Sequence, residues 1–436
     1  MPDTCVLILL DGLGDRAHFQ LGNRTPLQTA ETPCLDRLAS LGSTGLYHAG
    51  KLGKPLPSEN AHFAMFGNSM RNFPGRGPLE ALGADIELAE NDVAMLAHFC
   101  SVLTTLENHM VLKYDRICGT PQEIDALYAA LGPYEQDGVV VELHRTEGLF
   151  SVLTMKGDVS PHITDSNPMV DGRFVSQIHP LYDHRNDPAA QRTAQVLSDY
   201  HRWAHHRLNE VKENQTRIRQ TLPAINGLVT QRAGQLCECR SMRDKLGMRG
   251  LSTTSGHMYK GLAKFLGMDF HHVRDTRDPG NDIAERVRFA TENLGDYDFI
   301  HVHTKAPDRA AHTKSPKGKV KAIEALDRGL AESIEPLLKN EDVLLVVTSD
   351  HSTPSSGNLI HSGEPVPVMF IGDGVRRDNV EQFDEISVAS GALSCLRGDE
   401  LMHMILNYTD RARLGGIHDS PRPQLFWPGD YDPFTV

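Results

Sequence analysis

Short, almost continuous apolar runs that end in acidic residues constrain the fold of this chain more than any other feature. The run over 6–10 ends at Asp11, and the run over 343–348 is followed, after one serine, by Asp350 and His351. Uninterrupted apolar runs of this length are typical of strands that are buried on both faces of a parallel sheet. Ligands bind beyond the carboxyl ends of the strands in such sheets, so these polar residues mark an expected site.

Helical patterns alternate with the predicted strands. Residues 25–41 predict one helix, because their leucines share a face and a glycine follows. Further strands are expected at 298–303 and 366–371, and further helices at 319–338 and 399–408. This alternation predicts an α/β fold with a doubly wound, mostly parallel sheet.

The middle of the chain has a different pattern of apolar and polar residues. Short alternating segments occur at 139–143 and 149–155, one amphipathic helix is expected from Pro121, and residues 183–220 are polar with a helical period. We therefore expect a smaller α+β domain inserted into the sheet domain. The predicted boundaries give a metal-binding core at 1–88 and 235–436, and an insert at 89–234 that closes over the substrate and ends in a long helical return segment.

The composition excludes several classes of protein. The 436 residues include 44 Lys and Arg against 57 Asp and Glu, a formal charge of −13, which argues against a general nucleic-acid binder. The first apolar run is far shorter than the ~20 residues that span a bilayer, and no basic segment of a signal peptide precedes it. An odd count of seven cysteines indicates a reducing compartment. We expect a cytoplasmic enzyme with no nucleic-acid or membrane partner, and the sequence leaves its oligomeric state open.

Candidate metal ligands follow three of the predicted strands. A single histidine or aspartate at a strand end is usually a cap or a satisfied polar residue, but six such residues at equivalent positions of one sheet predict a site for two metals. Carboxylate and imidazole ligands suit Mn²⁺ or Zn²⁺, and sites made mostly of oxygen also accept Mg²⁺. The six candidates are Asp11, Asp308, His312, Asp350, His351 and His361.

A candidate nucleophile lies in the segment LPSENAH, where a loop leads into a predicted helix. Ser58 of this segment either caps the helix or attacks a substrate, and His62 lies nearby. The two roles are compatible, because a helix N-terminus also favours an anionic oxygen or a bound phosphate. Two metals can stabilise the attacking and leaving oxygens of a phosphoryl displacement. The residues therefore predict phosphoryl transfer through a phosphoserine.

Several blocks of sequence carry a family resemblance over most of the chain. They are DGLGDR at 11–16, TPCLDRL at 32–38, SENAH at 58–62, PGRGPLEALG at 74–83, KGLAKFLGM at 260–268, DRAAH at 308–312, DHSTP at 350–354 and HSGEPVP at 361–367. Together they resemble the archaeal-type cofactor-independent phosphoglycerate mutases of the alkaline phosphatase superfamily. The resemblance implies one metal bound by Asp308, His312 and His361, and a second bound by Asp11, Ser58, Asp350 and His351.

The resemblance also implies an activity and its cofactors. The chain is expected to be an isomerase that interconverts 2-phosphoglycerate and 3-phosphoglycerate, moving the phosphoryl group by way of Ser58. Two divalent ions are expected, Mn²⁺ first, with Mg²⁺, Zn²⁺ or Co²⁺ as alternatives. A metal-dependent phosphohydrolase or phosphonate-processing enzyme on the same scaffold remains the alternative, and a metal-binding regulatory protein is a third class.

The chain departs from the family at positions that usually carry basic residues, in the segments 95–99, 114–120 and 149–150. Phosphate and carboxylate recognition needs guanidinium or ammonium groups, so these departures bear on the substrate. We expect Lys260 to neutralise the transferred phosphate, and Asp115 to move a proton between hydroxyls. His62, Arg116 and Arg232 are the other expected substrate-binding residues, although a solvated surface arginine remains open for the last two. Lys305 and Arg309 are further candidate cations.

Overall fold

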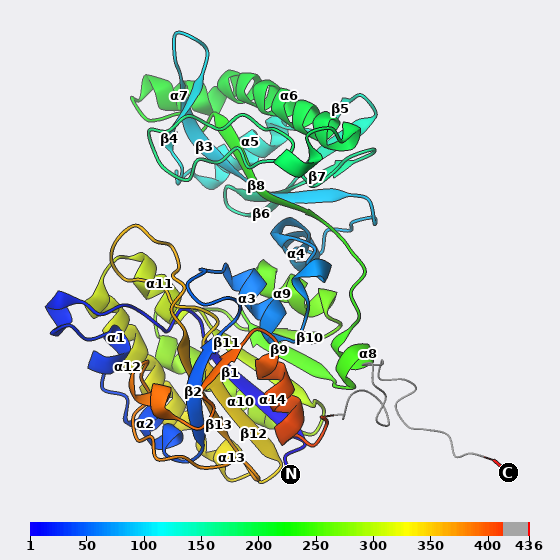
Figure 1. Ribbon diagram of the computed structural model, residues 1–436. Coiled ribbons are helices and arrows are strands. Elements are labelled where there is room, and N and C mark those ends of the chain that lie inside the picture. The colour runs from blue at the N-terminus through cyan, green and yellow to red at the C-terminus, as the bar shows by residue number, and fades with distance from the viewer. Residues whose placement is uncertain (413–434) are drawn as a thin grey trace. The chain divides into compact units, whose positions relative to one another are not determined.

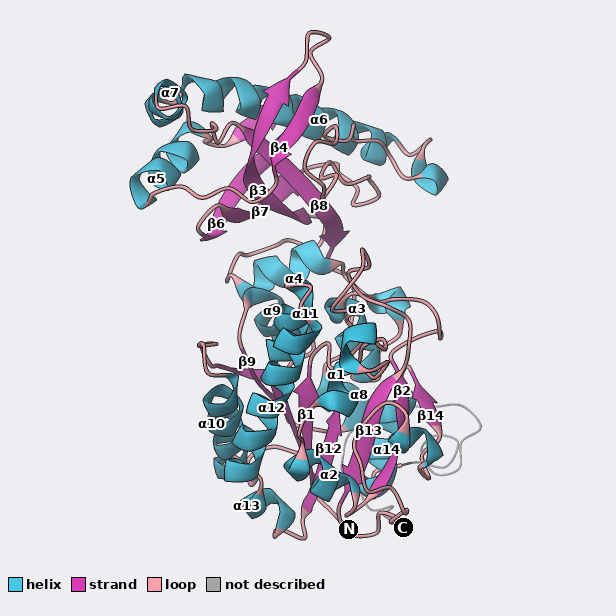
Figure 2. Ribbon diagram, turned by 90° about the vertical axis from the view of Figure 1, so that its left-hand side faces the viewer, coloured by secondary structure: helices cyan, strands magenta, loops and turns pink. Residues whose placement is uncertain are grey.

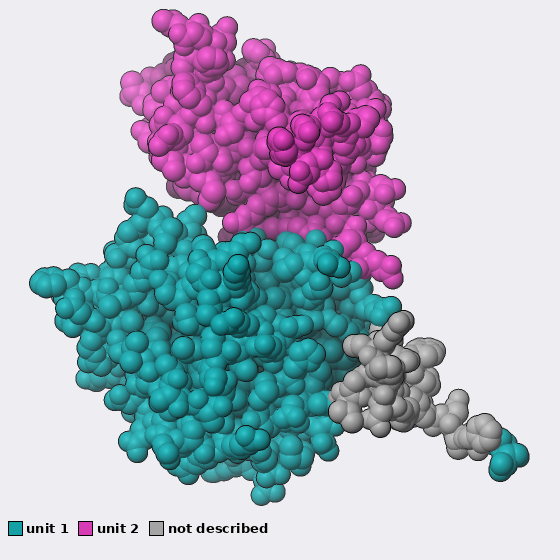
Figure 3. All heavy atoms as spheres, in the orientation of Figure 1, with its two compact units in different colours: residues 1–73, 239–436 teal, residues 74–238 magenta. Residues whose placement is uncertain are grey.

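The computed structural model describes residues 1–412 and 435–436. The chain divides into two compact units, residues 1–73 with 239–436 and residues 74–238 (Figure 1, Figure 3). Each unit has its own sheet and its own apolar core. Within the described residues, no helix is long and apolar enough to cross a membrane.

The first unit is built on a sheet of eight strands. Its order is β10-β9-β11-β1-β12-β13-β2-β14. Among the described strands of this sheet, β13 is antiparallel to both of its neighbours and the other pairs are parallel. The strands are β1 (Thr4–Leu10), β2 (Ser43–His48), β9 (Gly250–Thr254), β10 (Asp269–His272), β11 (Phe299–Thr304), β12 (Val343–Thr348), β13 (Val366–Ile371) and β14 (Cys395–Arg397).

Helices cover both faces of this sheet (Figure 2). One core joins alternate residues of β1, β11 and β12, such as Ile8 and Ile300, to helices α2, α10 and α12. On the opposite face Phe66, at the end of α3, packs against Phe299 and His301 of β11. The helices are α1 (Pro26–Thr29), α2 (Pro33–Ala39), α3 (Ser58–Met65), α8 (Met242–Leu246), α9 (His257–Phe265), α10 (Pro279–Glu292), α11 (Ala306–His312), α12 (Pro316–Ser333), α13 (Glu335–Leu338) and α14 (Glu400–Tyr408). The predicted doubly wound α/β fold is therefore confirmed.

Two of the predicted helices are each divided into two. The helix expected over 25–41 becomes α1 and α2, and the start of α2 is stabilised by Asp327 of α12, whose carboxylate accepts hydrogen bonds from the Cys34 and Leu35 amides at 3.1 and 2.8 Å. The helix expected over 319–338 becomes α12 and α13, which separate next to Pro336. A proline lacks the amide hydrogen that would continue the hydrogen bonds of the preceding helix.

The second unit contains an antiparallel sheet in the order β4-β3-β7-β6-β5, with β8 paired to β3. The long polar helix α6 is part of this unit, because Ala194, Leu197 and Tyr200 of its apolar face lie in the same core as the strands. The strands are β3 (Val93–Thr104), β4 (Met110–Tyr114), β5 (Tyr134–Gln136), β6 (Val139–Glu147), β7 (Phe150–Lys156) and β8 (Gly227–Gln235). The helices are α4 (Arg76–Gly83), α5 (Pro121–Ala130), α6 (Pro188–Glu210) and α7 (Lys212–Arg219).

In the structure, the chain passes from the first unit to the second between residues 73 and 74, and returns between residues 238 and 239. The boundaries predicted from the sequence are 88/89 and 234/235. The physical reason is the packing of α4 on strands β3 and β8. A Cβ atom on Gly77 of α4 would lie 2.0 Å from the Ala94 carbonyl oxygen, and one on Gly234 would lie 2.2 Å from the Pro74 carbonyl oxygen. These backbones approach so closely that α4 belongs with the second sheet.

A fully buried lysine connects the loops that follow β1 and β12. The Lys319 ammonium of α12 donates to the carbonyl oxygens of Gly14 and Thr353, both at 2.8 Å, and lies 3.2 Å from the Asp15 carboxylate. The same carboxylate accepts from the Ser355 amide. Lys319 thereby holds together two loops that start at neighbouring strand ends.

We expect Lys319→Met to lower the free energy of unfolding by about 3–5 kcal/mol, because the buried Asp15 carboxylate loses its ammonium partner. Combining it with Asp15→Asn should recover part of this loss, because the unpaired charge is then removed. Urea unfolding followed by circular dichroism measures both. A single variant as stable as the unmodified protein would contradict the prediction.

Candidate active site

The predicted metal ligands meet at the carboxyl ends of three adjacent strands. Asp11 directly follows β1, Asp350 and His351 follow β12, and helix α11 after β11 carries Asp308 and His312. Because β1 lies between β11 and β12 in the sheet, these segments are neighbours. The sheet order therefore brings together residues that lie far apart in the sequence.

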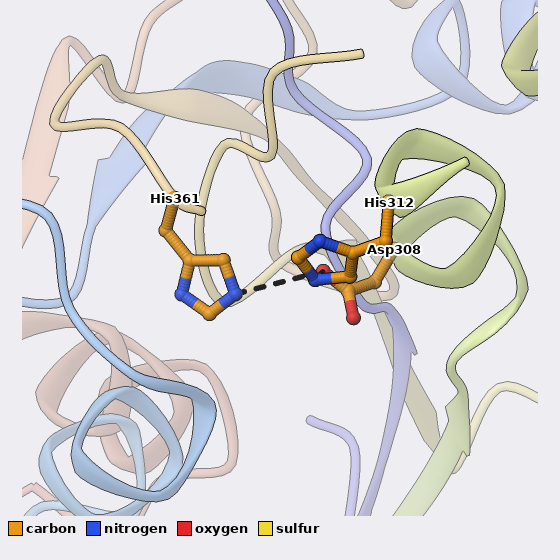
Figure 4. A group of neighbouring side chains, drawn as sticks. All are labelled: Asp308, His312 and His361. Carbon is orange, nitrogen blue, oxygen red and sulfur yellow. Dashed lines mark ion pairs between the residues drawn. The ribbon is translucent and has the colours of Figure 1, made fainter. Parts of the chain in front are cut away.

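Asp308, His312 and His361 form one candidate metal site (Figure 4). The Nε2 atoms of His312 and His361 lie 3.1 and 3.6 Å from Asp308 Oδ1. The His361 ring reaches Asp308 from the loop before β13, opposite α11 (Figure 4). The Nδ1 atom of His361 lies 2.7 Å from the Leu56 carbonyl oxygen, and this hydrogen bond leaves the Nε2 lone pair available to a metal.

Asp11, Asp350 and His351 form the second candidate site. The Nε2 atom of His351 lies 3.1 Å from Asp350 Oδ2 and 3.6 Å from Asp11 Oδ1. The two sites are joined through the backbone, because the Asp308 amide donates to the Asp11 carbonyl oxygen at 3.0 Å. Gly12 permits this approach: its φ is +67°, and a Cβ atom there would lie 2.7 Å from the Cβ of Asp308.

The three carboxylates share one pattern of hydrogen bonds. One oxygen of each is held: Asp11 Oδ2 by side chains, Asp308 Oδ1 by the Thr353 hydroxyl, and Asp350 Oδ1 by two backbone amides. Within the described residues, the other oxygens (Asp11 Oδ1, Asp308 Oδ2 and Asp350 Oδ2) are buried and accept no well-oriented hydrogen bond, although Lys305 Nζ lies 3.3 Å from Asp308 Oδ2 and His351 Nε2 lies 3.1 Å from Asp350 Oδ2. Buried carboxylate oxygens without donors are costly unless a cation binds them. This donor set therefore fits divalent metals.

Ser58 lies beside both sites at the start of α3. Its hydroxyl oxygen is 3.0 Å from His351 Nε2 and accepts from the Lys305 ammonium at 3.4 Å. Pro57 holds the N-cap position and Ser58 is the first helical residue, so its hydroxyl does not act as the helix cap. The position leaves this oxygen available for nucleophilic attack.

Lys305 supplies positive charge between the two sites. Its ammonium lies 3.3 Å from Asp308 Oδ2 and 3.7 Å from Asp11 Oδ2. Burial by itself raises the pKa of Asp11, but the Lys305 charge and a hydrogen bond from His303 outweigh it and hold this pKa below its usual range. The Asp11 carboxylate is therefore ionised and ready to bind a cation.

Of the expected substrate-binding residues, His62 and Lys260 lie in the first unit. His62 is fully buried, with its Nδ1 atom 2.8 Å from the Ser58 carbonyl oxygen, and burial lowers its pKa to about 4. Its ring thus contacts the backbone of the nucleophile rather than solvent. Lys260 lies on α9. The expected substrate contacts of both residues stay predictions.

The other expected residues lie in the second unit. Asp115 is hydrogen bonded to His98 Nε2 at 2.9 Å and paired with Arg116 at 3.2 Å, and the hydrogen bond from His98 lowers its pKa. The Arg116 guanidinium stacks on the Phe150 ring at 4.8 Å. Arg232, on β8, has a left-handed backbone with φ of 58°. Asp115 and Arg116 thus form one cluster, while the roles of all three stay predictions.

Sequence reasoning missed several side chains that contact a candidate metal ligand directly, among them Thr353, Tyr259 and His303. Tyr259 and His303 both donate to Asp11 Oδ2, at 2.7 and 3.0 Å. His303 ends the predicted strand over 298–303, which was a usable signal because ligands gather at strand ends. Tyr259 lies beside Lys260 on α9, and no local pattern distinguishes it from a core residue.

Comparison with known proteins gives matches over nearly the whole chain. A model described as the metalloenzyme superfamily matches residues 3–408. A protein of Methanocaldococcus jannaschii named 2,3-bisphosphoglycerate-independent phosphoglycerate mutase 2 is 41% identical, over 98% of this chain and 97% of its own length. A 2,3-bisphosphoglycerate-independent phosphoglycerate mutase of Methanopyrus kandleri is 35% identical, over 93% of this chain and 96% of its own. The solved structure of a cofactor-independent phosphoglycerate mutase from Thermoplasma acidophilum is 29% identical, with a TM-score of 0.63, and covers 93% of this chain and 100% of its own.

These matches extend over both units, so they are not confined to the sheet that carries the candidate metal ligands. They confirm the family that the sequence blocks predict. The chain belongs to the metalloenzyme superfamily and, within it, to the 2,3-bisphosphoglycerate-independent phosphoglycerate mutases.

Proposed function

We propose that this protein is a cytoplasmic isomerase that interconverts 2-phosphoglycerate and 3-phosphoglycerate through a phosphoserine at Ser58. The observation that carries the proposal is the position of the Ser58 hydroxyl, 3.0 Å from His351 and 3.4 Å from Lys305, beside buried carboxylate oxygens that accept no well-oriented hydrogen bond within the described residues. The names of the relatives support the same activity.

Two divalent metals, Mn²⁺ first, would be held by the two groups of ligands. Asp308, His312 and His361 would bind one ion, and the other would be bound by Asp11, Ser58, Asp350 and His351. Metals bound there would supply positive charge that lowers the pKa of the serine hydroxyl and stabilises charge on the transferred phosphoryl group.

The chain's own groups account for the remaining steps. The Ser58 oxygen attacks phosphorus, the bond to one glycerate oxygen breaks, and the other glycerate hydroxyl then takes the phosphoryl group back from the serine. Lys305, next to the serine oxygen, stabilises negative charge on this oxygen and on the phosphoryl group that is transferred. We further propose that Lys260 neutralises the phosphate, that Arg116 and Arg232 bind the glycerate carboxylate, and that Asp115 transfers the proton between the hydroxyls.

An assay of the purified protein tests the proposal directly. With Mn²⁺ and 3-phosphoglycerate, and without added bisphosphoglycerate, we expect 2-phosphoglycerate to accumulate, measured by coupled enolase absorbance or ³¹P NMR. Release of inorganic phosphate with no isomer formed would overturn the proposal in favour of a phosphohydrolase.

Ser58→Ala should reduce turnover by on the order of 10³-fold or more, because the covalent step loses its nucleophile. Ser390→Ala is a matched control, since the Ser390 hydroxyl is exposed and contacts only a local carbonyl oxygen in the part of the chain described here. Near-normal turnover of Ser58→Ala at normal metal content would contradict the phosphoserine.

Removal of metal with a chelator should abolish activity, and added Mn²⁺ should restore it. His361→Ala should lower the bound metal from two ions to one per chain, measured by elemental analysis, because one site loses a ligand. His403→Ala is the matched control, since His403 is 72% exposed on α14. Two tightly bound ions in His361→Ala would show that His361 is not a ligand.

A further inference from the structure

The Asp11 carboxylate is held by two side chains from outside the metal-binding loops. Tyr259 Oη of α9 donates to Asp11 Oδ2 at 2.7 Å, and His303 Nε2 of β11 lies 3.0 Å from the same oxygen. Asp11 Oδ1 accepts no hydrogen bond within the described residues. The two oxygens of one buried carboxylate therefore have opposite surroundings.

A third residue contacts the other ring nitrogen of His303. Thr254 Oγ1, at the end of β9, lies 2.7 Å from His303 Nδ1. The ionised Asp11 carboxylate can only accept, so Nε2 of His303 carries a proton and donates to it; Nδ1 of the neutral ring then accepts from the Thr254 hydroxyl, which also lies 3.3 Å from the Ser255 carbonyl oxygen. Thr254, His303 and Asp11 thus form a directed chain of hydrogen bonds.

Packing fixes both donors in place. The rings of Tyr259 and His303 lie 4.1 Å apart, and the His62 ring lies 5.0 and 5.2 Å from them. Tyr259 and His303 are buried, at 6% and 1% exposed. Neither donor can follow Asp11 if the carboxylate rotates, so rotation would break both hydrogen bonds.

This arrangement differs from that of the other aspartate of the same site. The held oxygen of Asp350 accepts from the backbone amides of Gly12 and His351, which belong to the metal-binding loops themselves. Asp11 instead depends on side chains of α9 and β11, and these can be changed without altering any metal-binding loop.

We propose that Tyr259 and His303 are positioning residues that make Asp11 bind the second metal through Oδ1 alone. The inference rests on the two-metal site of the proposed function. An aspartate that offers a single oxygen leaves coordination positions for Ser58 and for a phosphoryl oxygen. Groups that orient a metal ligand typically change metal affinity by about 10–100-fold when they are removed.

The test measures metal binding rather than activity. In a His361→Ala background only the Asp11 site remains complete, so titration of the apoprotein with Mn²⁺, followed by electron paramagnetic resonance, reports that site. Adding Tyr259→Phe should weaken Mn²⁺ binding by about 10–100-fold. In an Asp350→Ala background, which leaves the other site, the same change should have no effect.

Two further variants complete the test: the first is a control, and the second is an independent probe of the same site. Tyr297→Phe removes a hydroxyl that donates to Asp269 at 2.9 Å, outside the candidate site, and should leave both affinities unchanged. Thr254→Val keeps the shape of the side chain but removes the donor to His303, and should weaken the Asp11 site alone. This variant decides the question if Tyr259→Phe fails to fold.

Unchanged affinity at the Asp11 site in both Tyr259→Phe and Thr254→Val would overturn the proposal. Equal weakening of both sites would also overturn it, because a merely structural role would affect them together. If the unmodified protein binds two ions but forms no 2-phosphoglycerate, the proposed function fails while a selective effect of Tyr259→Phe still supports this inference.

Discussion

Three buried aspartates at adjacent strand ends impose the constraint on which the rest of the first unit depends. Asp11, Asp308 and Asp350 are all almost inaccessible to solvent, so their negative charges repel one another where water screens them little. The fold compensates with Lys305 between them and with hydrogen bonds to one oxygen of each carboxylate. The second oxygens are left for cations, so the arrangement favours bound metal.

Contacts within the protein hold the surroundings of these aspartates in place. Lys319 joins the loops after β1 and β12, and the Asp308 amide joins α11 to Asp11. Rigid placement of charged groups reduces the reorganisation needed during a reaction. The acidic charge of −13, which argued against a general nucleic-acid binder, includes these carboxylates, and they are the groups that can recruit positive charge to the site.

Elements with a clear local pattern were predicted well. The strand over 343–348 and the two strand ends that carry Asp11 and Asp350 appear where the sequence places them. The helix over 25–41 was predicted as continuous, because its interruption depends partly on Asp327 of a distant helix. The division between the units at 73/74 differs from the boundary predicted at 88/89 for a similar reason, since the contact of Gly77 with β3 involves backbone atoms that no periodicity describes.

The sequence by itself determined the class of fold, the identity of the metal-ligand candidates and the candidate nucleophile, because apolar periodicity and the polar residues at strand ends are local features. Only the tertiary structure decided which oxygen of Asp11 accepts hydrogen bonds and which side chains orient this carboxylate. Tyr259 and His303 lie 248 and 292 residues from Asp11 along the chain, yet both donate to its Oδ2. Contacts across such separations arise from the order of strands in the sheet, and that order is a property of the whole fold.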